Sequence, residues 1–146
     1  MKLSRRDLAT VLPALAAANA AAQTRPNATL ASKVYHAAQI PYSGDEKKKG
    51  RAFFRGAEHS GFNLEAHETI LGPGTETHAP HKHEHEEIVI LVEGTLQTFM
   101  EGKLETVEAG SVIFLGSNQM HSVRNIGTTP CRYYVIELHG KEGEKP

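Results

Sequence analysis

Histidines and carboxylates are concentrated in one short segment of this sequence. Residues 78–87 read HAPHKHEHEE, in a chain that has nine histidines among its 146 residues. Side chains alternate between the two faces of an extended strand, so His81, His83 and Glu87 share one face and can point into the same space. Two imidazoles and a carboxylate suit a divalent transition metal. The segment therefore predicts a metal site, and an exposed His-rich tract that binds metals non-specifically is the alternative.

Two spaced motifs in the chain resemble the two conserved motifs of the cupin family. The first reads Gly74…His81-x-His83-x3-Glu87-x6-Gly94, and the second reads Gly110-x5-Gly116-x-Asn118-x2-His121-x3-Asn125. The leading glycine of the first motif lies one residue further away than in the family pattern. In the second motif, Gly116 and Asn118 replace the usual Pro and Gly, in a turn that tolerates such exchanges. The motifs and the strands between them cover roughly residues 61–139.

The resemblance implies both a fold and a ligand set. Cupins are double-stranded β-helix (jelly-roll) barrels, and their two motifs together supply three histidines and one glutamate to a metal. Carried over to this sequence, the ligands are His81, His83, Glu87 and His121. In a six-coordinate ion this set leaves about two positions open for water, dioxygen or substrate. We expect one divalent transition metal (Fe, Mn, Ni, Co or Zn) as cofactor.

The histidines outside this ligand set carry separate expectations. His85 is expected beside the metal ligands or exposed, and His78 at the mouth of the site or in a surface loop. The candidate catalytic residues are His67 and Tyr133, which could transfer protons, although His67 could instead be a hydrogen-bonded core histidine. Three further histidines lie outside both motifs and are expected to be structural or exposed: His36, His59 and His139.

From residue 52 onward the sequence predicts an all-β domain. No sustained helical periodicity follows residue 22, and short β-rich runs alternate with turns that contain Gly, Pro or Asn. The predicted strands are Ala52–Arg55, Phe62–Leu71, Glu87–Val92, Thr95–Met100, Leu104–Val107, Ser111–Leu115, His121–Asn125 and Cys131–Leu138. Strand alternation suggests that Gln97, Phe99, Val123, Tyr133 and Val135 line the site. Even spacing of short strands favours a sandwich, barrel or jelly roll.

The N-terminal residues 1–22 have the pattern of a signal peptide. Basic residues precede an apolar run and then small residues, and Ser4-Arg5-Arg6-Asp7-Leu8 resembles the twin-arginine export signal, with Leu8 in place of Phe. The apolar run is too short to span a bilayer. We expect a periplasmic or secreted protein without stable membrane insertion after signal removal. The expected organisation is then an extension with an edge strand and loop (23–60), in which Val34–Ile40 forms an edge strand or packing arm, a single barrel domain (61–140) and a polar tail (141–146).

Composition narrows the classes of partner. The chain has 16 Lys and Arg against 17 Asp and Glu, which argues against a nucleic-acid binder. A single cysteine excludes an intramolecular disulfide and a Cys-based zinc ribbon. The run Ile88–Val92 is apolar on both strand faces, so the face outside the core needs a cover, either a second sheet or another subunit. We therefore expect a homodimer.

The expected function is that of an exported, metal-dependent enzyme that acts on an oxygen-bearing small molecule. The chemistry would be of dioxygenase, hydrolase or isomerase type. A non-catalytic periplasmic module that binds a metal or small ligand is the main alternative. A sugar isomerase or epimerase that uses His67 or Tyr133 is a third possibility. Arg55 and Arg124 are either contacts for an anionic substrate or ordinary surface cations.

Overall fold

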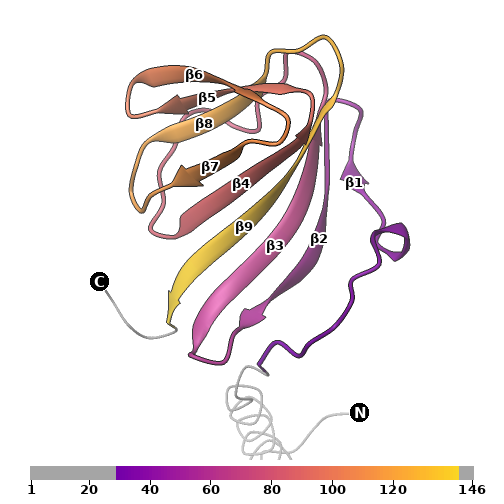
Figure 1. Ribbon diagram of the computed structural model, residues 1–146, viewed down its shortest axis with the longest axis vertical. Coiled ribbons are helices and arrows are strands. Elements are labelled where there is room, and N and C mark those ends of the chain that lie inside the picture. The colour runs from indigo at the N-terminus through magenta and orange to yellow at the C-terminus, as the bar shows by residue number, and fades with distance from the viewer. Residues whose placement is uncertain (1–28, 142–146) are drawn as a thin grey trace, which may run out of the picture.

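The computed structural model describes residues 29–141, which form two antiparallel β-sheets (Figure 1). The first sheet has the order β1-β2-β3-β9-β4-β7 and the second the order β6-β5-β8. The strands are β1 (Ser43–Gly44), β2 (Lys48–Ala57), β3 (Phe62–Leu71), β4 (Glu86–Glu93), β5 (Thr95–Met100), β6 (Lys103–Glu108), β7 (Val112–Leu115), β8 (His121–Asn125) and β9 (Cys131–Lys141). The prediction of an all-β domain is confirmed.

Helical structure in residues 29–141 is limited to one 3-10 turn, η1 (Ala37–Gln39). No helix in that range has the length and apolarity needed to cross a bilayer. The predicted signal peptide lies outside the described residues, as does all but the first residue of the predicted tail.

Most predicted strands appear in the structure with small shifts at their ends. The bounds of β3, β5 and β8 are those predicted, whereas β2 begins at Lys48 instead of Ala52. The edge strand expected in Val34–Ile40 is wrong. The amides of Gln39 and Ile40 donate to the carbonyls of His36 and Ala37 and form a turn. These amides are therefore not available for hydrogen bonds to a neighbouring strand. The segment packs as an arm, with the Tyr35 ring 5.3 Å from that of Phe54.

The apolar core lies between the two sheets. Alternate residues of β4, β5, β7 and β9 point inward. The buried apolar set is Leu71, Val89, Leu91, Leu96, Val107, Ile113, Leu115, Val123, Cys131, Tyr133 and Val135. On β5 the inward residues are Leu96 and Thr98, both buried. Gln97 and Phe99 therefore lie on the opposite face, and their predicted place in the cavity is wrong because the assumed alternation was displaced by one residue.

Asn125, the last residue of the second motif, fixes one end of β8. It is fully buried. Its Nδ2 donates to the carbonyls of Leu71 at 2.9 Å and Thr129 at 2.8 Å, and its Oδ1 accepts the amide hydrogen of Gly127 at 2.9 Å. These bonds tie the end of β3 to β8, the strand that begins with His121.

A buried carboxylate, Glu68 of β3, binds Tyr42, which directly precedes β1, and two arginines of the neighbouring strands. Its side chain accepts hydrogen bonds from Tyr42 at 2.9 Å, Arg132 at 3.2 Å and the Nε of Arg51. Burial by itself would raise the pKa of Glu68, but the hydrogen bonds from Arg51, Tyr42 and Arg132 outweigh it and hold that pKa below its usual range. Glu68 is therefore ionised and paired at neutral pH.

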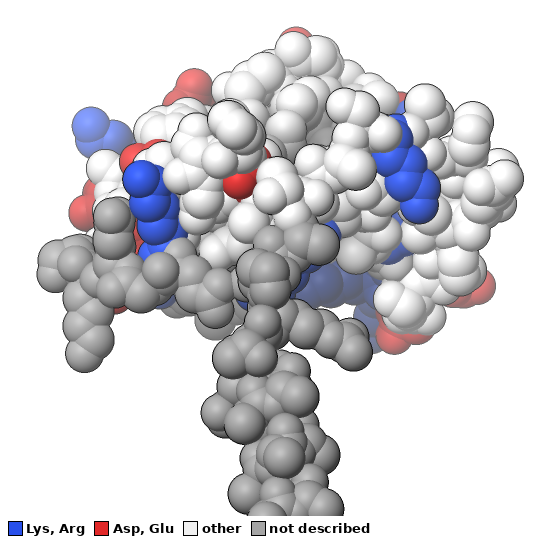
Figure 2. All heavy atoms as spheres, turned by 90° about the horizontal axis from the view of Figure 1, so that it is seen from below, with Lys and Arg blue, Asp and Glu red and all other residues white. Residues whose placement is uncertain are grey.

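Charged side chains are dispersed on the face of the molecule that looks downward in Figure 1. Figure 2 shows Lys and Arg there as separate groups, divided by uncharged surface and interspersed with Asp and Glu. This distribution accords with a formal net charge of -1 for the whole chain.

Candidate metal centre

Two distant segments bring three histidines together. The main chains of His81 and His121 pair as an isolated bridge, with N···O distances of 3.0 and 2.8 Å in the two directions. The His121 ring lies 4.7 Å, centroid to centroid, from the rings of both His81 and His83. One ligand nitrogen from each of the three histidines lies within 4.8 Å of the others. These histidines, from the two sequence motifs, can bind a metal.

Main-chain carbonyls orient two of these rings. Nδ1 of His83 lies 2.8 Å from the carbonyl oxygen of His85, and Nδ1 of His121 lies 2.8 Å from that of Gln119. A carbonyl oxygen only accepts hydrogen bonds, so Nδ1 carries the proton and Nε2 presents a lone pair. Both Nε2 atoms are buried without a hydrogen-bond partner, as is Nδ1 of His81. Such buried, unpartnered nitrogens fit a divalent cation.

Glu87 lies beside this trio at the start of β4. Its Oε1 is 3.2 Å from Nε2 of His83, and its Oε2 is 3.8 Å from Nε2 of His121. Glu87 does not fall in one close group with His81; its own close group contains His83 and His85. The structure thus brings together all four residues of the predicted ligand set. His83 belongs both to the close group with His81 and His121 and to the close group with Glu87.

His85 is half-buried beside the predicted ligands. Its ring stacks on that of His83 at 3.5 Å between centroids, with 1° between the planes. Its Nε2 lies 3.4 Å from Oε1 of Glu87. Burial lowers the pKa of His85, so its ring is neutral at neutral pH. Of the two places expected for His85, the structure shows the one beside the ligands.

The candidate catalytic residues both line the cavity next to the histidines. Nδ1 of His67 lies 3.8 Å from Oε1 of Glu65 and 3.9 Å from Oε1 of Glu137, and it is buried without a hydrogen-bond partner. His67 is therefore not the hydrogen-bonded core histidine that was the alternative. The Tyr133 hydroxyl is also buried and unpartnered among the described residues, and burial raises the pKa of Tyr133.

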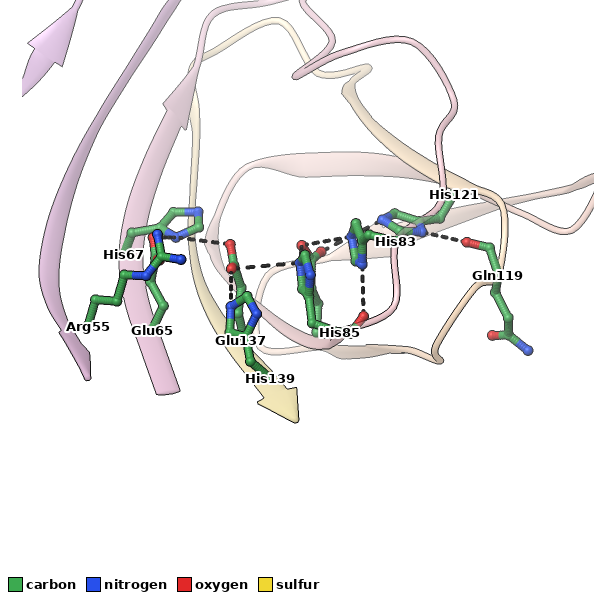
Figure 3. Close-up of polar contacts among 10 residues, drawn as sticks. Arg55, Glu65, His67, His83, His85, Gln119, His121, Glu137 and His139 are labelled. Atoms are coloured by element: carbon green, nitrogen blue, oxygen red, sulfur yellow. Dashed lines mark hydrogen bonds and ion pairs between the residues drawn. The ribbon is translucent and has the colours of Figure 1, made fainter. Parts of the chain in front are cut away.

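The row of polar side chains continues away from His83 to residues that the sequence reasoning missed. His139, expected to be structural or exposed, has its Nε2 2.8 Å from Oε2 of Glu137, and its ring lies 4.4 Å from that of His85. Figure 3 shows the side chains in line from His121 through His83, His85 and Glu137 to His67. Glu137 and His139 follow Tyr133 on β9 at alternate positions. That alternation was the available signal.

The cavity has a volume of about 720 Å³ and opens beside these groups. Its lining includes His81, His83, Glu87, His121 and His67, together with His78. The His78 ring meets that of His81 edge-on at 4.3 Å, and burial lowers the pKa of His78. His78 thus lies at the site although it belongs to an exposed loop.

The two arginines considered for anion binding lie outside the cavity lining. The Arg55 side chain is 74% exposed and pairs with Glu65 at 3.4 Å. Arg124 is half exposed and pairs with Glu76 at 3.5 Å. Both are surface cations in this structure.

Comparisons with known proteins indicate the same fold. Residues 67–137 match the family model described as Cupin domain. No curated protein matches the chain. Solved structures with the same fold include KdgF from a Halomonas species, with a TM-score of 0.65, 15% identity, and coverage of 77% of this chain and 97% of that chain.

Two further solved structures carry names of enzymes. The polyketide cyclase RemF from Streptomyces resistomycificus has a TM-score of 0.60 and 20% identity, with 77% of this chain and 82% of that chain covered. A predicted oxalate decarboxylase from Thermotoga maritima has a TM-score of 0.61 and 20% identity, with 74% and 100% covered. At these identities the likeness shows the fold alone, and it bears out the expected single-domain barrel.

Proposed function

We propose that the chain, whose residues 67–137 match the cupin-domain family model, is a metal-dependent enzyme acting on an oxygen-bearing small molecule. One observation carries the proposal. Buried, unpartnered nitrogens of His81, His83 and His121 converge at the wall of a cavity of about 720 Å³, with Glu87 beside them. The residues that would hold the ion are His81, His83, Glu87 and His121. Bound there, a divalent ion supplies Lewis acidity towards a substrate oxygen, or redox chemistry with dioxygen if it is iron.

The other cavity residues have roles set by their surroundings. His67 has an unpartnered Nδ1 next to two carboxylates, so it is placed to exchange a proton with a substrate in the cavity. Tyr133 keeps its proton at neutral pH because burial raises its pKa, so its free hydroxyl can donate a hydrogen bond to a substrate in the cavity. Val123 and Val135 line the cavity and exclude water from this side.

The proposal includes the expected location and assembly. We propose that residues 1–22 direct export to the periplasm or beyond, as the twin-arginine-like sequence suggests. We also propose a homodimer. Support comes from β7, where Val112 and Phe114 are exposed and pair in register with Ile90 and Ile88 of β4.

The proposed activity is tested with the full chain loaded with Co²⁺ or Fe²⁺. A panel of small hydroxy acids, keto acids and sugars is added, while Co²⁺ visible absorption, oxygen uptake and product formation are followed. We expect at least one compound to change the metal spectrum and to be converted. The His67→Gln variant should lower its turnover by about 100-fold or more and leave the Co²⁺ spectrum unchanged.

The matched control is His59→Gln, because His59 is exposed in the turn between β2 and β3. This variant should turn over the compound at the parent rate. A compound that binds tightly and is recovered unchanged would make the protein a binding module. A metal spectrum that responds to none of the panel, with no turnover, would contradict the proposed enzyme.

A further inference from the structure

Three carboxylates lie side by side on the inner face of the first sheet. In the strand register, Glu137 of β9 is directly opposite Glu65 of β3 on one side and Glu87 of β4 on the other. Like charges in directly opposed positions destabilise a sheet. Among residues 29–141, the one Lys or Arg ion pair to this row is that of Arg55 with Glu65, at 3.4 Å from a side chain that is mostly solvent-exposed. The row therefore needs positive charge from another source.

Histidines occupy the spaces between these carboxylates. Oε2 of Glu137 lies 2.8 Å from Nε2 of His139 and 3.7 Å from Nε2 of His85. These three residues offer ligand atoms that all lie within 4.8 Å of one another. Their side chains are between 16% and 25% exposed, so the group is shielded but reachable from solvent. Two imidazoles and a carboxylate at these separations suit a borderline divalent ion.

We propose that His85, Glu137 and His139 form a second metal site, which takes a divalent transition ion such as Zn²⁺, Co²⁺ or Mn²⁺. The site shares no ligand with His81, His83 and His121. Glu87 lies between the two positions, because its Oε1 is 3.2 Å from Nε2 of His83 and 3.4 Å from Nε2 of His85. An ion on Glu137 supplies the positive charge that the carboxylate row lacks. This inference goes beyond the proposed function and does not depend on it.

Glu137 belongs to two close groups, and the distances within each group decide which one we assign as the metal site. Oε1 of Glu137 faces His67 at 3.9 Å, and His67 with Glu65 and Glu137 makes a separate close group. The shortest nitrogen–oxygen distance in that group is 3.8 Å, against 2.8 Å for His139 and Glu137. We therefore assign the ion to the side of His139. Glu65 is a carboxylate neighbour of Glu137 that is not a ligand, which makes it a matched control.

The test is a Zn²⁺ titration of the untagged full chain, first stripped of metal, with bound zinc measured by elemental analysis after dialysis and affinities by calorimetry. We expect about two zinc ions per chain for the parent. Glu137→Gln, which keeps the side-chain shape, and His139→Ala should each lower the affinity of one of them by at least about tenfold. Glu65→Gln removes the same charge and should keep both. Circular dichroism checks that each variant is folded.

The outcomes separate this site from the central one. The parent binding a single zinc that Glu137→Gln and His139→Ala both retain would overturn the second site. Loss of an ion in Glu65→Gln equal to that in Glu137→Gln would overturn the ligand assignment. If His121→Ala still binds all the zinc of the parent while Glu137→Gln loses one ion, the second site stands and the central site falls.

Discussion

The rings of His83 and His121 are held by the carbonyl oxygens of His85 and Gln119, so the main chain fixes their tautomers. A side-chain substitution at Gln119 leaves its carbonyl in place. The donor geometry at the centre therefore depends on the loop conformation more than on which side chains the loop carries. The side chain of His85 does matter for this geometry, because the His85 ring stacks on the ring of His83.

Substitutions of a single residue, Tyr133, distinguish the contribution of side-chain packing to stability from that of hydrogen bonding. Its ring is buried in the core and its hydroxyl has no partner among the described residues. We predict that Tyr133→Phe changes the free energy of unfolding by no more than about 1 kcal/mol, because no hydrogen bond is lost. Tyr133→Ala should cost about 3–5 kcal/mol because it opens a cavity in the core. Urea unfolding measures both; a loss above about 2 kcal/mol in the Phe variant would show that the hydroxyl is bonded.

Among the elements, strands with clear boundaries were predictable and strand faces were less so. β3, β5 and β8 are bounded by turn residues, and their predicted limits are those observed. The inward face of β5 was assigned one residue out, because its apolar Leu96, Phe99 and Met100 do not alternate simply. The η1 turn was missed because it depends on local hydrogen bonds that apolar patterning does not reveal.

The candidate site shows the same division. Motif spacing predicted His81, His83, Glu87 and His121 as one set of metal ligands. In the structure these four side chains lie close together. The row of Glu65, Glu137 and His139 was not predicted, because the order of the strands in the sheet determines which of these residues are neighbours. β9 lies between β3 and β4 in the sheet although it comes last in the chain, and no local pattern of the sequence shows that neighbourhood.

The Glu68 network gives the first sheet a pH-dependent stability. The folded-state pKa of Glu68 is below its unfolded value, so its contribution is fully present above the unfolded pKa and is lost as pH falls through the folded pKa. We predict that Glu68→Gln lowers the free energy of unfolding at pH 7 by on the order of 3 kcal/mol, since Arg51 and Arg132 lose their buried partner.

The difference between the parent and Glu68→Gln should shrink as pH falls below about 4.3, the ordinary range of a glutamate. Urea unfolding at several pH values between 7 and 3 measures this. The matched control is Glu76→Gln, because Glu76 pairs with Arg124 at the surface and should change stability by less than about 1 kcal/mol. A constant difference between parent and Glu68→Gln down to pH 3 would contradict the assigned ionisation.

For the whole molecule, the proposed dimer predicts a concentration-independent mass in light scattering of twice the 15.9 kDa of one chain. Phe114→Asp places a charge beside Ile88 on the outer face of the first sheet and should yield monomers. Leu104→Asp is the control, since Leu104 is 64% exposed on β6 of the other sheet. Dimers that persist in Phe114→Asp and dissociate in Leu104→Asp would place the interface on the second sheet.

The central claim is that residues far apart in the chain build one metal centre. Its most direct test is elemental analysis of the purified, untagged full chain beside His121→Ala and His59→Ala. His121→Ala should contain about one metal ion per chain less than the parent, and His59→Ala should match the parent. A tract of exposed histidines at residues 78–87 would not need His121. Equal metal contents in the parent and His121→Ala would therefore show that this tract binds alone and would contradict the four-residue centre.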